Sequence, residues 1–333
     1  MRAVQISELT GPAALRVVDV PEPDATHPLS PDDAVLIEVE AAGVSFPELL
    51  QSRGEYQLKP DLPFIPGAEV AGVVRSAPAG SAHQPGDRVA AMCMLGGFAE
   101  TVAAPDFLTF RLADELDAAQ GAGLVLNYHT AYFSLVTRGA LEPTETVLVH
   151  GAAGGVGTAT LQVTKGLGAR AFAIVSSDAK EEVARRAGAD EVFRSDGSWK
   201  DEVRAAGGVD VVIDPVGGDR MVDSLRCLNE GGRLVVVGFT AGSIPEVKVN
   251  RLLLNNVSVV GAGWGAYVLS KPALNAEIQR EIDGLIASGH VRPIVGARLP
   301  LEGAAEALEL IDDRRAVGKV VLDIAASPSF SRG

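Results

Sequence analysis

The sequence predicts an α/β protein: a doubly wound parallel sheet joined to a β-rich domain that is discontinuous in sequence. Three observations lead to this prediction. The first 120 residues contain short extended segments divided by turn-forming Pro and Gly. From Asp117 onward, apolar strand-like segments alternate with helical ones. After Gly265, further helix and strand patterns follow that one parallel-sheet domain does not need, so we expect this tail to return to the β-rich part.

Six short segments of the N-terminal part have strand character. Turn signals such as Pro21-Glu-Pro23 and Pro85-Gly-Asp87 separate them. Short strands with frequent turns predict a barrel-like β unit. The expected strands are Ala3–Ile6, Leu15–Val20, Val35–Val44, Ala68–Ser76, Arg88–Met92 and Phe98–Ala103.

The central part begins with a helical stretch over Asp117–Thr137 and then alternates regularly. Apolar strands that alternate with helices predict a parallel sheet with right-handed crossovers. The expected strands are Val147–Val149, Ala171–Val175, Glu191–Phe193, Val209–Ile213, Leu234–Val237 and Val257–Val260. The expected helices are Val156–Leu167, Asp178–Ala187, Trp199–Ala205 and Met221–Leu228.

The C-terminal part has its own pattern. We expect helices over Leu274–Ser288 and Leu301–Asp312, a strand over Val320–Ile324, and a frayed end over Ser327–Gly333. The predicted division gives residues 1–122 and 264–333 to the β-rich domain and residues 123–263 to the parallel-sheet domain, with a cleft between the two.

Composition excludes several classes of partner. Of the 333 residues, 47% are apolar, which is typical of a globular protein. The formal net charge is −14 and no basic cluster is present, so nucleic acid and anionic membranes are poor partners. No apolar run approaches the length of a membrane span. Two cysteines, Cys93 and Cys227, suit a reducing compartment, and we expect a cytoplasmic protein.

A glycine-rich turn follows the first strand of the parallel sheet. The spacing is Gly151-x-x-Gly154-Gly155-x-Gly157, and a helical pattern begins at Val156. Bare backbone at a helix N-terminus lets a pyrophosphate approach unpaired amides and the positive end of the helix dipole. We therefore predict that Gly154, Gly155, Val156 and Gly157 bind a dinucleotide; the alternative is a tight turn that needs glycine only for packing.

Cofactor preference depends on the residues that end the second strand. An acid that accepts from the ribose 2′-hydroxyl is typical of NAD sites, whereas here the strand ends in Ser176-Ser177. Asp178 follows, and we expect it to cap the next helix. Lys180 lies one turn into that helix and could reach a 2′-phosphate. The pattern favours NADPH, with Lys180 as a solvated helix residue being the alternative.

Other cofactor contacts are expected from strand ends and from the helix that enters this domain. Thr130 lies on that helix, Gly217 follows the fourth strand, and Gly238 and Phe239 follow the fifth. In open α/β sheets, ligands bind outside the carboxyl ends of the strands.

Several motifs in this order resemble one known family. The chain is similar to the zinc-independent quinone oxidoreductase branch, the zeta-crystallin-like enzymes, of the medium-chain dehydrogenase/reductase superfamily. The resemblance implies a Rossmann domain and a GroES-like domain. It also implies that Arg314 matches an arginine near the 2′-phosphate, while Ser195 stands where relatives often have tyrosine. The motifs are Ala42–Tyr56, Leu62–Gly72, Gly86–Val89, Gly96–Glu100, Gly151–Gly157 and Asp214–Gly218.

Zinc chemistry is disfavoured by the residues at two positions. Zinc-containing relatives would place Cys near position 45 and His at position 68, where this chain has Ser45 and Ala68. A structural zinc site usually takes four cysteines, and the chain has two. We therefore expect hydride transfer without a metal. An acceptor that delocalises charge onto oxygen, such as a quinone or an alkene conjugated to a carbonyl, then suits the site best.

Two residues are predicted to contact the acceptor. Tyr56 matches the tyrosine that faces the nicotinamide in the resembling branch, and a neutral phenol can donate a hydrogen bond or a proton. Ser45 stands where that branch usually has Asn, which leaves its polar contact weaker or differently directed. Packing within a loop is the alternative for Tyr56. We expect Glu48 and Arg53 to form a local ion pair that braces this loop.

These inferences predict an NADPH-dependent, metal-free reductase of quinones or related activated double bonds. One alternative is reduction of α,β-unsaturated carbonyls, including enoyl thioesters. Another is a non-catalytic protein that binds NADPH. We also expect a homodimer that forms through the edge strand Val257–Val260.

Overall fold

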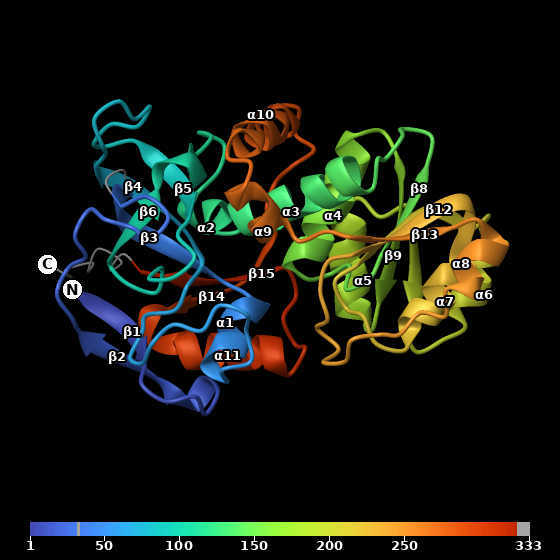
Figure 1. Cartoon of the computed structure of the whole chain (residues 1–333), viewed down its shortest axis with the longest axis horizontal. Helices are drawn as coiled ribbons and strands as arrows, with labels where there is room; N and C mark the ends of the chain where they lie inside the picture. Colours follow the sequence, from blue (N-terminus) through green and yellow to red (C-terminus); the bar gives the residue numbers. More distant parts are fainter. Residues whose placement is uncertain (32–33, 325–333) are drawn as a thin grey trace, which may run out of the picture. The chain divides into compact units, whose positions relative to one another are not determined.

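The computed structural model describes residues 1–31 and 34–324, which form two compact units. One unit contains Met1–Leu126 together with the described residues from Val295 onward, and the other contains Asn127–Ile294. The predicted frayed end, Ser327–Gly333, lies outside the described residues. Figure 1 shows the elements of both units.

The first unit is built on a mixed sheet with the order β14-β15-β3-β4-β5-β7, in which β6 also pairs with β3. Strands β14 and β15 pair in parallel, and the other pairs are antiparallel. A separate hairpin joins β1 and β2. The strands are β1 Arg2–Ile6, β2 Leu15–Asp19, β3 Ala34–Val44, β4 Glu69–Ser76, β5 Arg88–Met92, β6 Thr101–Pro105, β7 Thr109–Arg111, β14 Val295–Pro300 and β15 Lys319–Asp323. The helices are η1 Pro12–Ala14, α1 Phe46–Ser52, η2 Asp106–Leu108, α2 Ala118–Gly121, η5 Leu301–Gly303 and α11 Ala304–Asp312.

Strand β3 organises this unit because three other strands pair with it. It is buried along most of its length, and β4, β6 and β15 all run antiparallel to it. Val321 of β15 lies opposite Gly43 of β3. The C-terminal tail thus returns to the N-terminal sheet, as the sequence predicts, and helix α11 contributes Ala304, Ala307 and Leu308 to the same apolar core.

The second unit contains a parallel sheet of six strands within the described residues, in the order β10-β9-β8-β11-β12-β13. This is the doubly wound Rossmann order, in which the chain starts at the centre, goes outward to one edge and then returns to build the other half. The strands are β8 Thr146–Val149, β9 Arg170–Val175, β10 Glu191–Arg194, β11 Val209–Asp214, β12 Leu228–Val236 and β13 Ser258–Gly261. The GroES-like and Rossmann fold class predicted from the sequence is confirmed.

Helices cover both faces of this sheet. Helices α4 and α5 lie on one side, and α6 and α7 lie on the other (Figure 1). Apolar side chains from β8, β9 and β11 pack with those of α6 and α7. The helices are η3 Val125–His129, α3 Thr130–Tyr132, η4 Phe133–Arg138, α4 Gly155–Gly166, α5 Asp178–Arg186, α6 Trp199–Ala205, α7 Arg220–Cys227, α8 Asn250–Asn255, α9 Trp264–Leu269 and α10 Ala273–Ala287.

Contacts between residues place 264–294 with the parallel sheet, whereas the sequence analysis assigns this range to the β-rich domain. The reason is the packing of α9 and α10. Gln279 of α10 hydrogen-bonds to His129 at 2.8 Å, and the ring of Trp264 packs edge-on against His129. Ile278 and Ile282 are also buried. Within residues 1–31 and 34–324, no helix is both long and apolar enough to span a membrane.

Candidate functional site

The glycine turn joins β8 to α4 through a very close approach of two backbone segments. A Cβ atom added to Gly157 would lie 2.2 Å from the carbonyl oxygen of Gly151, so only glycine fits there. Gly151 has a φ of +58°, and its carbonyl oxygen accepts a hydrogen bond from the Gly154 amide at 2.9 Å. Gly154 is the N-cap of α4 and has no side chain to cap it. The first-turn amides of Gly155, Val156 and Gly157 therefore have no intrahelical acceptor and suit an anion.

The loops that follow β8, β11 and β12 lie side by side at the carboxyl edge of the sheet. A Cβ atom at Gly151 would lie 3.2 Å from Val216, which follows β11. A Cβ atom at Gly217 would lie 2.9 Å from the Phe239 ring, which follows β12. The reversal of strand order falls between β8 and β11, and this is the position where dinucleotides bind in such sheets. The structure thus brings Gly217, Gly238 and Phe239 close to the glycine turn.

Thr130 lies beside the same turn, on the helical segment that precedes β8. Its neighbour Asn127 contacts the start of α4, because a Cβ atom at Gly155 would lie 2.9 Å from Asn127 Oδ1. Thr130 is 8% exposed and begins α3, which packs against α4. The structure therefore places Thr130 next to the predicted cofactor residues.

Ser176, Ser177 and Lys180 form one polar group where β9 ends. The Lys180 ammonium donates to Ser176 Oγ at 3.2 Å, and the Lys180 amide donates to Ser177 Oγ at 3.4 Å. Ser177 is thus the N-cap of α5, and the expectation that Asp178 caps this helix is wrong. Asp178 is the first helical residue, and its carboxylate accepts from Arg194 at 2.5 Å.

Arg194 is a basic residue of this group that sequence reasoning missed. It ends β10, the strand beside β9, and its guanidinium donates to the carbonyl oxygen of Ser176 at 3.2 Å. Parallel neighbours end at the same edge of a sheet, so a basic residue at the end of the third strand was a usable signal. Two cations, Lys180 and Arg194, therefore adjoin Ser176.

Arg314 follows α11 in the other unit, with a φ of +56° and an amide that donates to the Ile311 carbonyl oxygen. Its predicted role at the 2′-phosphate stays a prediction.

Ser45 and Glu48 lie at the start of α1, where the sequence analysis expects a loop. Ser45 is the N-cap, and its backbone amide donates to Glu48 Oε2 at 2.9 Å. Glu48 is fully buried, and its other carboxylate oxygen accepts from the Ala68 amide at 2.8 Å. The expected Glu48–Arg53 ion pair is wrong, because Arg53 pairs with Asp312 of α11. Burial raises the pKa of Glu48 to about 7, although the nearby Lys319 ammonium opposes this shift.

The Ser45 hydroxyl has a buried cation behind it. The Lys319 ammonium donates to Ser45 Oγ at 2.6 Å and also to Glu69 Oε1. Glu69 Oε2 accepts from the Leu126 amide at 2.9 Å. Lys319 is 4% exposed and Glu69 is 1% exposed. Sequence reasoning missed this pair, although a lysine at the edge of the apolar run Val320–Ile324 was a signal that it needed a partner.

Tyr56 follows α1 and is half-buried. Burial is the main cause that raises its pKa, and the negative charge of Glu48 adds to the effect. In the part of the chain that the structure describes, no group hydrogen-bonds to the Tyr56 hydroxyl. The phenol therefore stays protonated at neutral pH and has its donor available for a ligand.

Zinc-containing relatives have zinc ligands at two positions where this chain has Ser45 and Ala68. The side chains here are a hydroxyl and a methyl group. Neither is a zinc ligand. Among the described residues, no group of three or more His, Cys, Asp or Glu is arranged to hold a metal ion. Cys93 is fully buried, and burial raises the pKa of its thiol, so it is not an activated thiolate.

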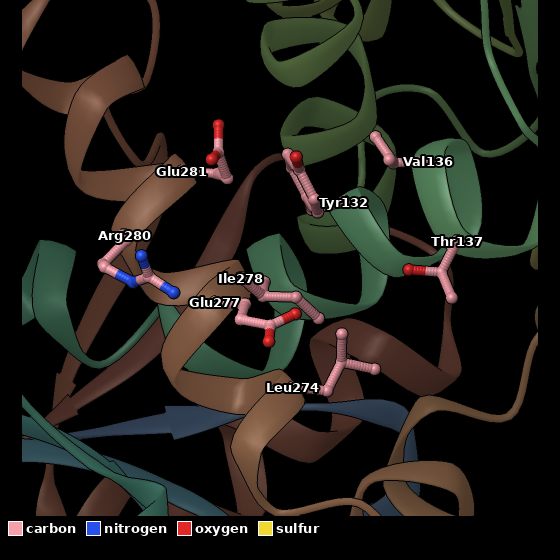
Figure 2. A pocket seen from close by; sticks show the side chains of 8 residues that line it. All are labelled: Tyr132, Val136, Thr137, Leu274, Glu277, Ile278, Arg280 and Glu281. Carbon is pink, nitrogen blue, oxygen red and sulfur yellow. The ribbon is translucent and has the colours of Figure 1, made fainter.

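The second unit also has a cavity of about 390 Å³ beside α10. Figure 2 shows its lining, in which side chains from α10 face those of α3 and η4. The cavity shares no residue with the predicted cofactor site. It is lined by Tyr132, Val136, Thr137, Leu274, Glu277, Ile278, Arg280 and Glu281.

Two family models match the chain, one in each unit. The model described as "Alcohol dehydrogenase GroES-like domain" matches residues 31–114. The model described as "Zinc-binding dehydrogenase" matches residues 155–280, a range that contains neither Ser45 nor Ala68.

Three known proteins are similar over nearly the whole chain. The "Quinone oxidoreductase-like protein 2" of Rattus norvegicus is 36% identical, with 97% of this chain and 92% of the relative covered. The quinone oxidoreductase of Thermus thermophilus, also solved in complex with NADPH, is 34% identical with a TM-score of 0.82, covering 97% and 100% of the two chains. The Escherichia coli quinone oxidoreductase complexed with NADPH is 27% identical with a TM-score of 0.87 and the same coverage.

Proposed function

Since this chain belongs to the quinone oxidoreductase branch of the medium-chain dehydrogenase/reductase superfamily, we propose that it transfers hydride from NADPH to quinones or related activated double bonds without a metal. The observation that carries the proposal is the glycine turn, where Gly157 and Gly151 approach so closely that a side chain cannot fit. Because the turn carries no side chains at these positions, none there covers the first backbone amides of α4, and a pyrophosphate could reach them.

NADPH fits the residues around this turn. Gly154, Gly155, Val156 and Gly157 would hold the pyrophosphate, and Thr130 would contact the nicotinamide or a phosphate. The loop with Gly217 would pass near the adenine, and the loop with Gly238 and Phe239 would pass near the nicotinamide ribose. When bound, reduced nicotinamide supplies a hydride.

The 2′-phosphate would lie against Ser176, Ser177 and Lys180. The hydroxyls and the ammonium are donors, and Arg194 adds a second cation. Two carboxylates, those of Asp178 and Asp196, pair with Arg194, and this pairing offsets their repulsion of a phosphate. Two related enzymes were solved with NADPH, which supports this preference.

Tyr56 and Ser45 would contact the acceptor. Hydride transfer to a quinone or enone leaves negative charge on its carbonyl oxygen, so the site needs hydrogen-bond donors there. The Tyr56 phenol is protonated, and Lys319 holds the Ser45 hydroxyl in place. A Ser45 hydroxyl and an Ala68 methyl group would offer no coordination to zinc, which supports the metal-free assignment.

A turnover panel tests the proposal. NADPH oxidation would be followed by its absorbance with benzoquinones and naphthoquinones, with enones, and with an enoyl thioester, after dialysis against a chelator. We expect the quinones to give the highest kcat/KM and the chelator to have no effect. Faster reduction of the enones or the thioester would favour the alternative reductase. If no acceptor raised the rate of NADPH oxidation above background while fluorescence showed tight NADPH binding, the protein would be a non-catalytic NADPH-binding protein.

We also infer that the protein forms a homodimer through β13. Among the strands of residues 1–31 and 34–324, this one ends the parallel sheet and pairs only with β12, so its outer edge would be available for a second copy. Helix α8, which precedes it, exposes Leu253 and Leu254, each at 75%. Light scattering after gel filtration should give twice the chain mass, and a Leu254→Arg, Val260→Lys double variant should give one chain mass with the fold retained.

A further inference from the structure

Lys319, Glu69 and Ser45 form a buried polar chain that ends in a hydroxyl. Lys319 starts β15, Glu69 starts β4, and Ser45 caps α1, so three elements converge at this point. Gly43 of β3 makes room for the chain, because a Cβ atom there would lie 2.7 Å from Lys319 Cε and 2.8 Å from Glu69 Cγ. The Lys319–Glu69 pair is almost completely buried, whereas Ser45 is only half-buried. The Ser45 end of the chain is thus the accessible one.

The direction of the hydrogen bonds follows from the chemistry of the groups. An ammonium can only donate, so Ser45 Oγ must accept from Lys319 at their separation of 2.6 Å. A hydroxyl that accepts in this way still has its own proton to donate. Because the bond comes from a charged donor in a buried site, it polarises the Ser45 O–H group and makes it a stronger donor.

We propose that Lys319 and Ser45 form a proton relay to the oxygen of the reduced acceptor. The relay rests on the proposed function, in which hydride from NADPH reaches the acceptor and leaves a negative charge on its oxygen. The Ser45 O–H bond breaks and its proton goes to that oxygen. A Lys319 N–H bond breaks in turn, and that proton goes to Ser45 Oγ. Lys319 is left as a neutral amine. After the product leaves, the Ser45 proton returns to Lys319, and Ser45 takes a proton from water at its accessible end, which releases hydroxide to the solvent.

Glu69 has a separate role in this arrangement. It is the carboxylate that holds Lys319 in position, and the Leu126 amide holds Glu69 itself. The carboxylate also compensates the buried charge of the Lys319 ammonium, because removal of one partner of a buried pair leaves an uncompensated charge. Glu69 is therefore a positioning residue and gives up no proton.

The test compares variants that remove one part of the relay at a time. Ser45→Ala removes the hydroxyl, and Ser45→Thr keeps one. A Lys319→Met, Glu69→Gln double variant removes both buried charges together, so that neither is left unpaired. Arg233→Met is the matched control, since it breaks the partly buried Arg233–Glu145 pair in the other unit. For each, we would measure kcat, KM for NADPH, and the solvent deuterium isotope effect on kcat.

We expect Ser45→Ala to lower kcat about 100-fold, the size of a typical general-acid contribution, with an unchanged KM for NADPH. Ser45→Thr should recover most of that loss. The double variant should lower kcat at least about tenfold even though Ser45 is present. Both losses should change the solvent isotope effect, whereas Arg233→Met should lower the melting temperature and leave the isotope effect as in the wild type. A Ser45→Ala protein with wild-type kcat and isotope effect would overturn the relay.

A second readout needs no cofactor. In ¹⁵N-lysine spectra of the ligand-free protein, the buried Lys319 ammonium should give a slowly exchanging signal that is lost in the double variant and shifted in Ser45→Ala. Absence of that signal in the folded wild type would also overturn the relay. If the wild type turns over no acceptor, the proposed function fails first, and the relay fails with it.

Discussion

The Tyr56 phenol combines a raised pKa with a hydroxyl that no described group holds. Burial and the charge of Glu48 both disfavour the phenolate, so Tyr56 remains a donor over the working pH range. At the residue scale this makes Tyr56 the simplest part of the site to test.

We expect Tyr56→Phe to lower kcat/KM for the acceptor by about 10- to 100-fold, because one donor to the developing charge is lost. KM for NADPH should not change. Steady-state kinetics with one quinone and both coenzymes would show this. Tyr132→Phe is the matched control, since Tyr132 is a tyrosine at the separate cavity. An equal loss in both variants, or a loss confined to NADPH binding, would contradict the role of Tyr56.

A substitution of Arg194 tests the proposed preference for NADPH over NADH. Arg194→Gln keeps an N–H donor for the Ser176 carbonyl but removes the positive charge. We expect KM for NADPH to rise about tenfold while KM for NADH stays constant, because only NADPH carries the 2′-phosphate. Arg185→Gln is the control, since Arg185 pairs with Glu181 on the exposed side of α5. A parallel change for both coenzymes would mean that Arg194 is merely structural.

At the scale of elements, the junction of β8 and α4 depends on the absence of one methyl group. Gly157→Ala would drive a Cβ atom into the Gly151 carbonyl. We expect a loss of about 1–3 kcal/mol in stability and at least a tenfold weaker binding of NADPH, since the turn must move to relieve the overlap.

Gly284 in the last turn of α10 provides the opposite case for the same substitution. Nothing lies within 4 Å of a Cβ atom there, and its φ is not positive. Gly284→Ala should therefore stabilise the protein by about 0.5–1 kcal/mol, because alanine favours helix. Denaturant unfolding and coenzyme fluorescence titrations would measure both variants. Equal changes in stability and in NADPH affinity for Gly157→Ala and Gly284→Ala would refute the steric argument.

At the scale of the whole molecule, two buried groups, one in each unit, should make the stability respond to pH in opposite directions. Glu48 has a pKa of about 7, above its unfolded value of 4.5. Its contribution to stability is fully present below pH 4.5 and is lost as pH rises through 7. His150, buried and held by Ser224, has a pKa of about 4, below its unfolded value of 6.5. Its contribution is present above pH 6.5 and is lost as pH falls toward 4.

Calorimetric melting curves over this pH range would resolve the two effects. Glu48→Gln should reduce the loss of stability above about pH 7, which amounts to about 3 kcal/mol when the carboxylate is fully ionised. His150→Gln should reduce the loss below about pH 6. Glu48→Gln should leave the acid side of the stability curve as in the wild type, and His150→Gln should leave the alkaline side unchanged. A Glu48→Gln curve with the wild-type alkaline limb would contradict the burial of an ionisable Glu48.

The sequence predicts those features whose physical basis is local. Helix α6 has the predicted bounds, Trp199–Ala205, and strand β5 has the predicted bounds, Arg88–Met92, because both follow from period and turn residues. The glycine turn is likewise contained in one strand–turn–helix segment. Helix α1, Phe46–Ser52, was missed because its buried residues include the polar Glu48, Gln51 and Ser52, so its buried face shows no apolar period. Its position depends on the buried contacts of Glu48 rather than on a helical period.

By itself, the sequence determined the fold class, the position of the glycine turn and the family resemblance, because backbone sterics and hydrophobic period act over a few neighbouring residues. Only the tertiary structure decided which distant side chains meet. Lys319 contacts Ser45 across 274 positions, and Arg53 chooses Asp312, 259 positions away, over nearby Glu48. Such pairs depend on the register of β15 against β3 and on the packing of α11. No local pattern of residues encodes that register, so the partners of buried charges emerge only when the sheet is assembled.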